Sequence, residues 1–261
     1  MHIKRALVTG AGARLGQAMA LALAEDGFDV AVHYHGSSEQ ADQTAADVRA
    51  LGRAASVHRA DLLDAAETSA LVPSAVEALG GPLSVLINNA SIFEYDRIDT
   101  ATAESWHRHM GSNLRAPFFL TQAFAAQAPT PVMDEMGEPV AQAMVINMID
   151  QRVRKLTPEF MTYTIAKMGL WAMTQTTAQG LAPAVRVNAI GPGPTLQGGR
   201  QSADHFARQR NATVLKRGSN PADIVGAMRY FLNAPGITGQ LLCVDGGQHL
   251  AWQTPDILGV E

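Results

Sequence analysis

A tyrosine and a lysine four positions apart, Tyr163 and Lys167, are the residues of this chain best suited to acid–base chemistry. They lie in a segment, 160–181, whose pattern predicts a helix, and side chains four apart share one helix face. An ammonium group beside a phenol favours the phenolate, so we expect Lys167 to lower the pKa of Tyr163. The pair therefore predicts a general acid/base. The alternative is a chance pair on a surface helix.

A second candidate site is the glycine-rich segment 9–16, where a predicted strand at 6–8 meets a predicted helix at 15–25. Glycines at such a turn let the backbone approach a pyrophosphate, while free N–H groups at the helix N-terminus bind its charge. No Lys-Ser or Lys-Thr pair follows, which excludes the loop of the P-loop nucleotidases. In this context a cofactor site is favoured over a purely structural turn.

The end of the second predicted strand indicates which cofactor. Chains that bind NAD usually place Asp or Glu there, about 20 residues after the glycines. This chain instead reads His33-Tyr34-His35-Gly36-Ser37-Ser38. A missing carboxylate leaves room for a 2′-phosphate, which Arg14 and the hydroxyls of Ser37 and Ser38 could bind. The sequence therefore favours NADP(H).

The elements that must position these residues alternate along the chain. Short apolar strands are predicted at 6–8, 30–32, 54–58, 85–87, 144–148, 185–190 and 241–244, and helices at 15–25, 38–51, 65–79, 104–126, 160–181 and 221–232. This alternation predicts one α/β domain, residues 1–261, with a parallel sheet covered by helices on both faces. Two stretches interrupt the pattern: residues 129–140 are predicted as a surface loop, and a substrate lid is expected near 194–215.

Composition excludes several other classes of protein. The net charge of −4 excludes a general electrostatic affinity for nucleic acid. No apolar run approaches the ~18–20 residues of a membrane span, and no signal-peptide core is recognisable, so we expect a cytoplasmic location. The single cysteine, Cys243, excludes an intramolecular disulfide and any cysteine-rich metal site. No metal is predicted.

Taken in order, the motifs resemble those of the short-chain dehydrogenase/reductase family. They are Thr9-Gly10 with Gly16, Asn88-Asn89-Ala90, Asn113, Tyr163-Thr164-Ile165-Ala166-Lys167, Asn188-Ala189-Ile190-Gly191-Pro192-Gly193 and Val244-Asp245-Gly246-Gly247. The resemblance covers about residues 3–250. It implies a single-domain Rossmann fold with a doubly wound, seven-stranded parallel sheet. It also implies hydride transfer with a nicotinamide cofactor, and commonly a homotetramer.

The resemblance also implies roles for individual residues. Tyr163 would donate a proton, Lys167 would hold the nicotinamide ribose, and Asn113 would support a proton-relay water. The implied cofactor-binding residues are Gly10, Arg14, Leu15, Gly16, His33, Tyr34, Ser37, Asp61, Leu62, Asn89, Ala90, Ser91, Tyr163, Lys167, Pro192 and Gly193.

Two positions depart from the family pattern. Arg14 stands where the family normally has glycine, and Asp150 stands thirteen residues before Tyr163, where it normally has a serine. An ionised carboxylate cannot donate a hydrogen bond to a carbonyl, so Asp150 argues against simple ketone or alcohol chemistry. It suits a substrate with N–H groups, or a carboxylic acid that shares a proton with Tyr163. The alternative is that Asp150 is a helix cap and activity is lost.

Arg14, His33-Tyr34-His35 with Ser37, residues 89–93 and residues 147–150 resemble one branch of the family, the pteridine reductases. That branch includes bacterial dihydromonapterin and dihydrofolate reductases of the short-chain type. The implied substrate-binding residues are Arg14, Ser91, Phe93, Asp150 and Tyr163, with Phe93 stacking on the pterin. Gly36 replaces an arginine that the branch usually carries, which weakens the grip on a 2′-phosphate. Alternatively, Phe93 is a loop aromatic that covers the core.

We therefore expect an NADPH-dependent short-chain reductase that reduces a C=N bond of a pterin-like substrate, a dihydropteridine or dihydrofolate. Two alternatives stay open: a carbonyl or alcohol oxidoreductase acting on another small substrate, and a non-catalytic sensor that binds NADP. The presence of both Tyr163 and Lys167 counts against the sensor. The expected partners are a small-molecule substrate and further copies of the chain, with neither nucleic acid nor membrane.

Overall fold

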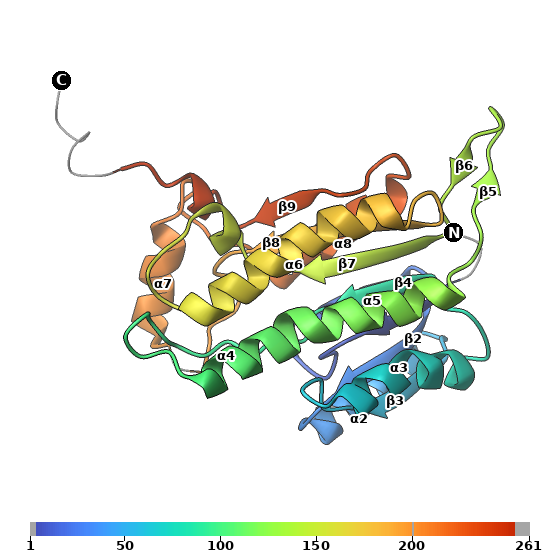
Figure 1. Ribbon diagram of the computed structural model, residues 1–261, viewed down its shortest axis with the longest axis horizontal. Coiled ribbons are helices and arrows are strands. Elements are labelled where there is room, and N and C mark those ends of the chain that lie inside the picture. Colours follow the sequence, from blue (N-terminus) through green and yellow to red (C-terminus); the bar gives the residue numbers. More distant parts are fainter. Residues whose placement is uncertain (1–3, 200, 254–261) are drawn as a thin grey trace.

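A seven-stranded parallel sheet organises the computed structural model, which describes residues 4–199 and 201–253 (Figure 1). The strand order is β3-β2-β1-β4-β7-β8-β9. The strands are β1 (Arg5–Val8), β2 (Asp29–Tyr34), β3 (Ala55–Arg59), β4 (Val85–Asn88), β7 (Ala143–Met148), β8 (Val185–Pro192) and β9 (Leu241–Val244). The central strands are short and almost wholly apolar because both of their faces are covered.

Two helical layers enclose this sheet. One face packs against α1 (Arg14–Glu25), α2 (Ser38–Ala50) and α8 (Pro221–Asn233), with Met19, Leu23 and Phe231 in its core. The other packs against α3 (Ala65–Ala78), α5 (Ala116–Gln127) and α6 (Met161–Gly180), with Leu120 and Phe124 in its core. The predicted doubly wound, seven-stranded Rossmann fold is thus confirmed.

The strand order places a crevice at one point on the carboxyl edge of the sheet. β1 pairs with both β2 and β4, with Leu7 opposite Leu86 and Val8 opposite Ile87. The chain leaves β1 toward one face and β4 toward the other, and ligands of doubly wound folds bind where such connections diverge. The glycine-rich segment 9–16 and the segment after Asn88 therefore lie on either side of this crevice.

The helical segment predicted over 104–126 is present, but it is not one regular α-helix. The structure has α4 (Ala103–Met110), a π-helical turn η1 (Gly111–Arg115) and then α5. A π turn adds one residue to a helix without interrupting its apolar pattern, so the pattern alone does not reveal it; such turns are frequent at functional sites. This one contains Asn113.

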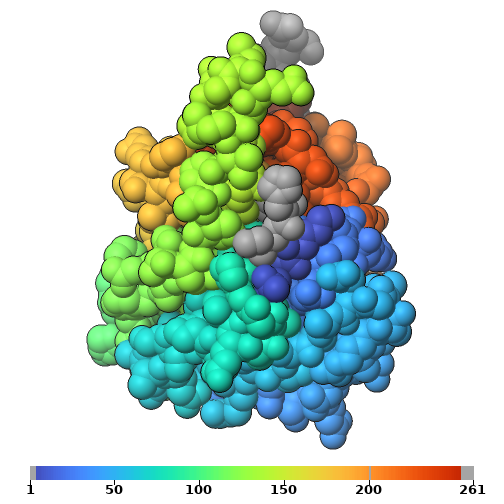
Figure 2. Space-filling model, turned by 90° about the vertical axis from the view of Figure 1, so that its right-hand side faces the viewer, coloured from blue at the N-terminus to red at the C-terminus, as the bar shows by residue number. Residues whose placement is uncertain are grey.

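The segment predicted as a surface loop, 129–140, does lie at the surface, but part of it is a hairpin. β5 (Val132–Met133) pairs antiparallel with β6 (Pro139–Val140), and the hairpin projects from the body of the molecule (Figure 2). The Asp134 carboxylate fixes its turn by accepting hydrogen bonds from the N–H groups of Met136 and Glu138, both at 2.9 Å. Across the described ranges, no helix is long and apolar enough to cross a membrane.

Candidate active site

Asp150, Tyr163 and Lys167 meet at the carboxyl end of the sheet. Helix α6 presents Tyr163 and Lys167 toward Asp150, two residues after the end of β7, and the Tyr163 hydroxyl donates to Asp150 Oδ2 at 3.0 Å. Lys167 Nζ lies 5.6 Å from the centre of the Tyr163 ring and donates to the Met148 carbonyl at 2.8 Å. Three of the four residues that the sequence suggested for catalysis are thus brought together, and the fourth is Asn113.

Burial controls the protonation of this group. It raises the pKa of Asp150 and, together with the neighbouring Asp150 charge, raises the pKa of Tyr163 well above its ordinary value. Burial lowers the pKa of Lys167 to about 8. The expectation of a lowered tyrosine pKa is therefore wrong, because desolvation and the adjacent carboxylate outweigh the effects of Arg152 and Ser91 that lower it. Tyr163 is a neutral phenol that can donate a proton.

The two oxygens of Asp150 have different partners. Oδ1 accepts a hydrogen bond from the Arg152 N–H at 2.8 Å, at the start of the 3₁₀ turn η2 (Gln151–Arg154). Oδ2 is the partner of Tyr163. Asp150 therefore caps the 3₁₀ turn η2, as the helix-cap alternative expected. It also accepts a hydrogen bond from Tyr163, which that alternative did not include.

Asn113 fixes the segment that follows β4. Its amide donates to the Ile92 carbonyl at 2.8 Å, and its Oδ1 accepts from the Ile92 N–H at 2.9 Å. The side chain is fully buried. The π turn thus aims Asn113 at the backbone next to Ser91 and Phe93, where it holds both residues at the site.

Phe93 stands over the catalytic group. Its ring stacks on that of Phe160 with centroids 4.3 Å apart, and meets the Tyr163 ring edge-on at 4.7 Å. The side chain is 45% exposed, so it does not cover the core. The Ser91 hydroxyl lies close enough to the Tyr163 phenol to act on its pKa, which this contact by itself would lower. An aromatic face and a proton donor therefore lie side by side.

A cavity of about 540 Å³ occupies the crevice between the start of α1 and the segment after β4. Ten of the predicted cofactor residues line it: Gly10, Arg14, Leu15, Gly16, His33, Asp61, Leu62, Asn89, Ala90 and Ser91. Six do not: Tyr34, Ser37, Tyr163, Lys167, Pro192 and Gly193. Lining residues that the sequence interpretation missed are Ala13, His35, Leu63, Ile92, Arg108 and Ser112. Most of these are sequence neighbours of predicted ones, but Arg108 and Ser112 come from α4 and η1 and carry no motif.

The glycine turn is built for close approach. Gly10 has φ +63°, and a Cβ on Gly16 would overlap the Gly10 carbonyl. His33 Nδ1 accepts a hydrogen bond from the Gly10 N–H, and its Nε2 contacts the Ala60 carbonyl, both at 3.0 Å. Burial lowers the His33 pKa to about 4, so the ring is neutral. His33 therefore acts mainly by tying the turn to the chain after β3.

Arg14 joins the glycine turn to the predicted lid. Its guanidinium donates to the carbonyls of Gln197 at 2.9 Å and Leu196 at 3.2 Å. Its φ of +57° explains why glycine suits this position in other chains. The lid thus rests against the entrance of the crevice.

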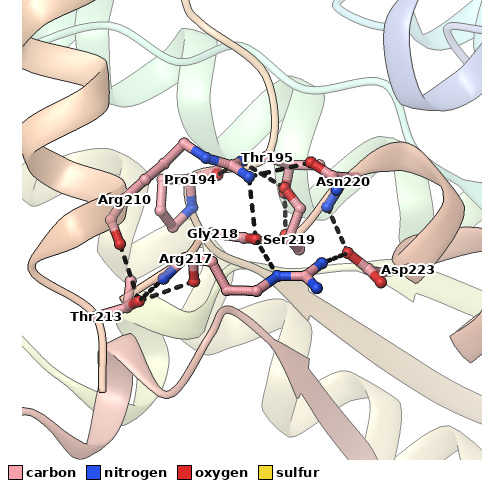
Figure 3. Close-up of polar contacts among 9 residues, drawn as sticks. All are labelled: Pro194, Thr195, Arg210, Thr213, Arg217, Gly218, Ser219, Asn220 and Asp223. Atoms are coloured by element: carbon pink, nitrogen blue, oxygen red, sulfur yellow. Dashed lines mark hydrogen bonds and ion pairs between the residues drawn. The ribbon is translucent and has the colours of Figure 1, made fainter. Parts of the chain in front are cut away.

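The two ends of the predicted lid, residues 194–215, are tied together (Figure 3). Arg210, on the unpredicted helix α7 (Ala203–Asn211), donates to the carbonyls of Pro194 at 2.8 Å and Ser219 at 2.6 Å, and to Asn220 Oδ1 at 3.0 Å. The hydroxyls of Thr195 and Ser219 are 2.5 Å apart.

Comparisons with known proteins agree with this geometry. Residues 10–249 match the family model described as Enoyl-(Acyl carrier protein) reductase. The chain is similar to the crystal structure of FolM alternative dihydrofolate reductase 1 from Brucella suis in complex with NADP, with 40% identity, a TM-score of 0.89, and coverage of 97% of this chain and 98% of that one. The corresponding protein from Brucella canis, complexed with NADP, is 38% identical with a TM-score of 0.88, and the match covers 98% of this chain and 98% of that one. The 3-oxoacyl-(acyl-carrier-protein) reductase FabG from Staphylococcus aureus is 29% identical over 252 residues, 95% of this chain and 98% of the relative.

Proposed function

This chain belongs to the short-chain dehydrogenase/reductase family, and from that premise we propose that it is an NADPH-dependent reductase of a pterin-like heterocycle. The reaction reduces a C=N bond of a dihydropteridine or dihydrofolate, adding hydride to carbon and a proton to nitrogen. The observation that carries the proposal is the hydrogen bond from Tyr163 to Asp150, beside the exposed ring of Phe93.

The residues of this chain suit proton delivery to a ring nitrogen. A buried carboxyl with a raised pKa, hydrogen-bonded to a neutral phenol, holds a proton to higher pH than a free carboxyl would. Phe93 offers a face on which a planar ring can stack, an interaction that adds ~0.5–1.5 kcal/mol beyond the burial of area. Stacking would orient the ring, and Tyr163 with Asp150 would protonate its nitrogen.

The crevice fits a dinucleotide with a 2′-phosphate. Gly10 and Gly16 allow the backbone to approach a pyrophosphate at the N-terminus of α1, and Arg14 brings a cation to the same turn. β2 ends without a carboxylate, and the exposed His35 follows it. When bound, NADPH supplies the hydride. Lys167 would hold the nicotinamide ribose, and the loop Pro192-Gly193 would lie over the ring.

Reduction of a ketone is the second candidate, favoured by the similarity to the 3-oxoacyl reductase FabG. Asp150 stands against it, because an ionised carboxylate beside Tyr163 cannot donate a hydrogen bond to a carbonyl oxygen. A protonated Asp150 would remove that objection, so the choice is one for experiment.

The test is NADPH consumption by the purified chain with a dihydropterin, a dihydrofolate and a 3-oxoacyl thioester in parallel. The proposal expects oxidation with the pterins at a kcat/KM at least tenfold above that with the thioester, a difference of about 1.4 kcal/mol. Faster turnover of the thioester would replace the proposal with the ketone alternative. Binding of NADPH without turnover of any substrate would favour the sensor.

We further propose a homotetramer and a cytoplasmic location. Half-exposed aromatic side chains, Trp106, Phe118 and Phe119, lie on α4 and α5, and the two phenylalanines line a groove of about 870 Å³. An apolar groove of this kind suits contact with another copy of the chain. The free Cys243 is compatible with a reducing compartment.

A further inference from the structure

Helix α6, which carries Tyr163, begins without a cap of its own. The residue before it is Phe160, whose side chain has no hydrogen-bond acceptor, and whose φ of +56° turns the chain sharply into the helix. The first N–H groups of a helix lack partners within it, and when buried they need acceptors from elsewhere. The acceptors must therefore come from another part of the chain.

Asp96, from the irregular segment after β4, supplies them. Its carbonyl accepts a hydrogen bond from the Phe160 N–H at 2.8 Å, and its Oδ1 accepts from the Thr162 N–H at 3.2 Å. Its Oδ2 accepts from the Thr162 hydroxyl and, at 3.1 Å, from the Ser105 hydroxyl. Asp96 is only 2% exposed. Burial alone would raise its pKa, but these hydrogen bonds lower it overall, so Asp96 is a carboxylate at a helix N-terminus.

The hydrogen bonds that start at Asp96 form a chain in which each donor and each acceptor is determined. The Thr162 hydroxyl gives its single proton to Asp96, so it must accept from His109 Nδ1, which lies 2.7 Å away. The other ring nitrogen, Nε2, then accepts from the Glu94 N–H at 3.1 Å. His109 is fully buried, and burial lowers its pKa, which agrees with this neutral form. The chain of bonds starts at the helix and ends on the backbone next to Phe93.

This chain of bonds links the two halves of the proposed site. Thr162 precedes Tyr163, and Glu94 follows Phe93. The His109 ring itself lies 5.9 Å from the Tyr163 ring, in an edge-on arrangement. Resting on the function proposed above, we infer that Asp96, Thr162 and His109 are positioning residues that fix the Tyr163 hydroxyl relative to the aromatic face of Phe93. The Thr162 hydroxyl is central to this arrangement, because it bonds to both Asp96 and His109.

A matched pair of substitutions tests this inference. Thr162→Val keeps the shape of threonine but removes the hydroxyl, whereas Thr162→Ser keeps the hydroxyl. Thr44→Val is the control, since Thr44 is a fully buried threonine on α2 whose hydroxyl donates to the Gln40 carbonyl at 2.9 Å, away from the proposed site. A displacement of about 1 Å at a reacting group can cost ~100-fold in rate, so we expect kcat to fall roughly 10- to 100-fold in Thr162→Val. The Kd for NADPH should not change, and Thr162→Ser and Thr44→Val should keep most of the parental kcat.

The outcomes separate this inference from the proposed function. If the parent reduces a ketone and not a pterin, the proposed function fails, and the same variants are compared on the ketone, because Tyr163 would still be the proton donor. If Thr162→Val equals Thr162→Ser in kcat on whichever substrate the parent reduces, the inference is overturned alone. Amide hydrogen exchange needs no turnover: residues 92–97 and 160–164 should exchange faster in Thr162→Val than in Thr162→Ser, and equal exchange would also overturn it.

Discussion

Asp150→Asn is the substitution that most directly tests the proposed proton transfer. Asparagine keeps the size of the side chain, and its Oδ1 can still accept from the Arg152 N–H at the start of η2. Its amide nitrogen, however, would replace the oxygen that accepts from Tyr163 at 3.0 Å. The variant thus removes the shared proton and leaves the capping bond.

The size of the expected loss in kcat depends on the proton donor that remains in the variant, Tyr163. A general acid contributes about 10²- to 10⁴-fold, and Tyr163 keeps its own proton, so we expect the lower end, about 100-fold in kcat, or about 2.7 kcal/mol. Asp150 bonds to the Tyr163 hydroxyl and the Arg152 N–H and is not among the residues proposed to hold the dinucleotide, so the Kd for NADPH should change far less than kcat.

Single-turnover oxidation of NADPH with a dihydropterin measures the chemical step, and fluorescence titration measures cofactor binding. Asp134→Asn is the matched control, because the Asp134 carboxylate also accepts from the N–H two residues later, in the hairpin. That control should retain the parental rate.

The pH profile provides the second measurement. Burial raises the pKa of Asp150, so the protonated pair persists to higher pH than a free carboxyl would, and activity should be highest on the acid side. The rate should fall as pH rises through the apparent pKa of the pair, and this fall should be lost in Asp150→Asn. A variant as fast as the parent, or a parental rate that climbs steadily from about pH 5 to about pH 9, would refute the reasoning.

Three further predictions concern the remaining groups. Tyr163→Phe should lower kcat by about two to four decades while NADPH still binds; near-parental turnover would show that another group is the proton donor. The parent should bind NADPH at least about tenfold more tightly than NADH, about 1.4 kcal/mol, and Arg14→Ala should remove much of that preference in fluorescence titrations. Because the pKa of Lys167 is lowered to about 8, its charge is lost as pH rises through that value, and NADPH affinity should fall there. Affinity that is level across that range would argue against a role for the Lys167 charge in binding.

Local pattern accounts for most of the fold and for the core of the candidate site. The apolar strands and helices are recognisable because each must cover or be covered by its neighbour, and their alternation leaves a doubly wound parallel sheet as the natural arrangement. Tyr163 and Lys167 are four residues apart on one helix, so their shared face needs no long-range information. Gly10 and Gly16 are likewise recognisable, because they stand at a predicted strand-to-helix turn, where dinucleotide-binding folds place glycines.

Only the tertiary structure shows the pKa shifts and the long-range hydrogen bonds of these groups. The direction of the shift in the Tyr163 pKa depends on desolvation and on Asp150, thirteen residues away, and the spacing of Tyr163 and Lys167 reveals neither of them. The cap of α6 comes from Asp96, 66 positions before Thr162, and Arg14 reaches Gln197 across 183 positions. The physical reason is the same in each case: side-chain partners and burial are set by how the elements pack, whereas the sequence by itself determines only which elements form and which faces they bury.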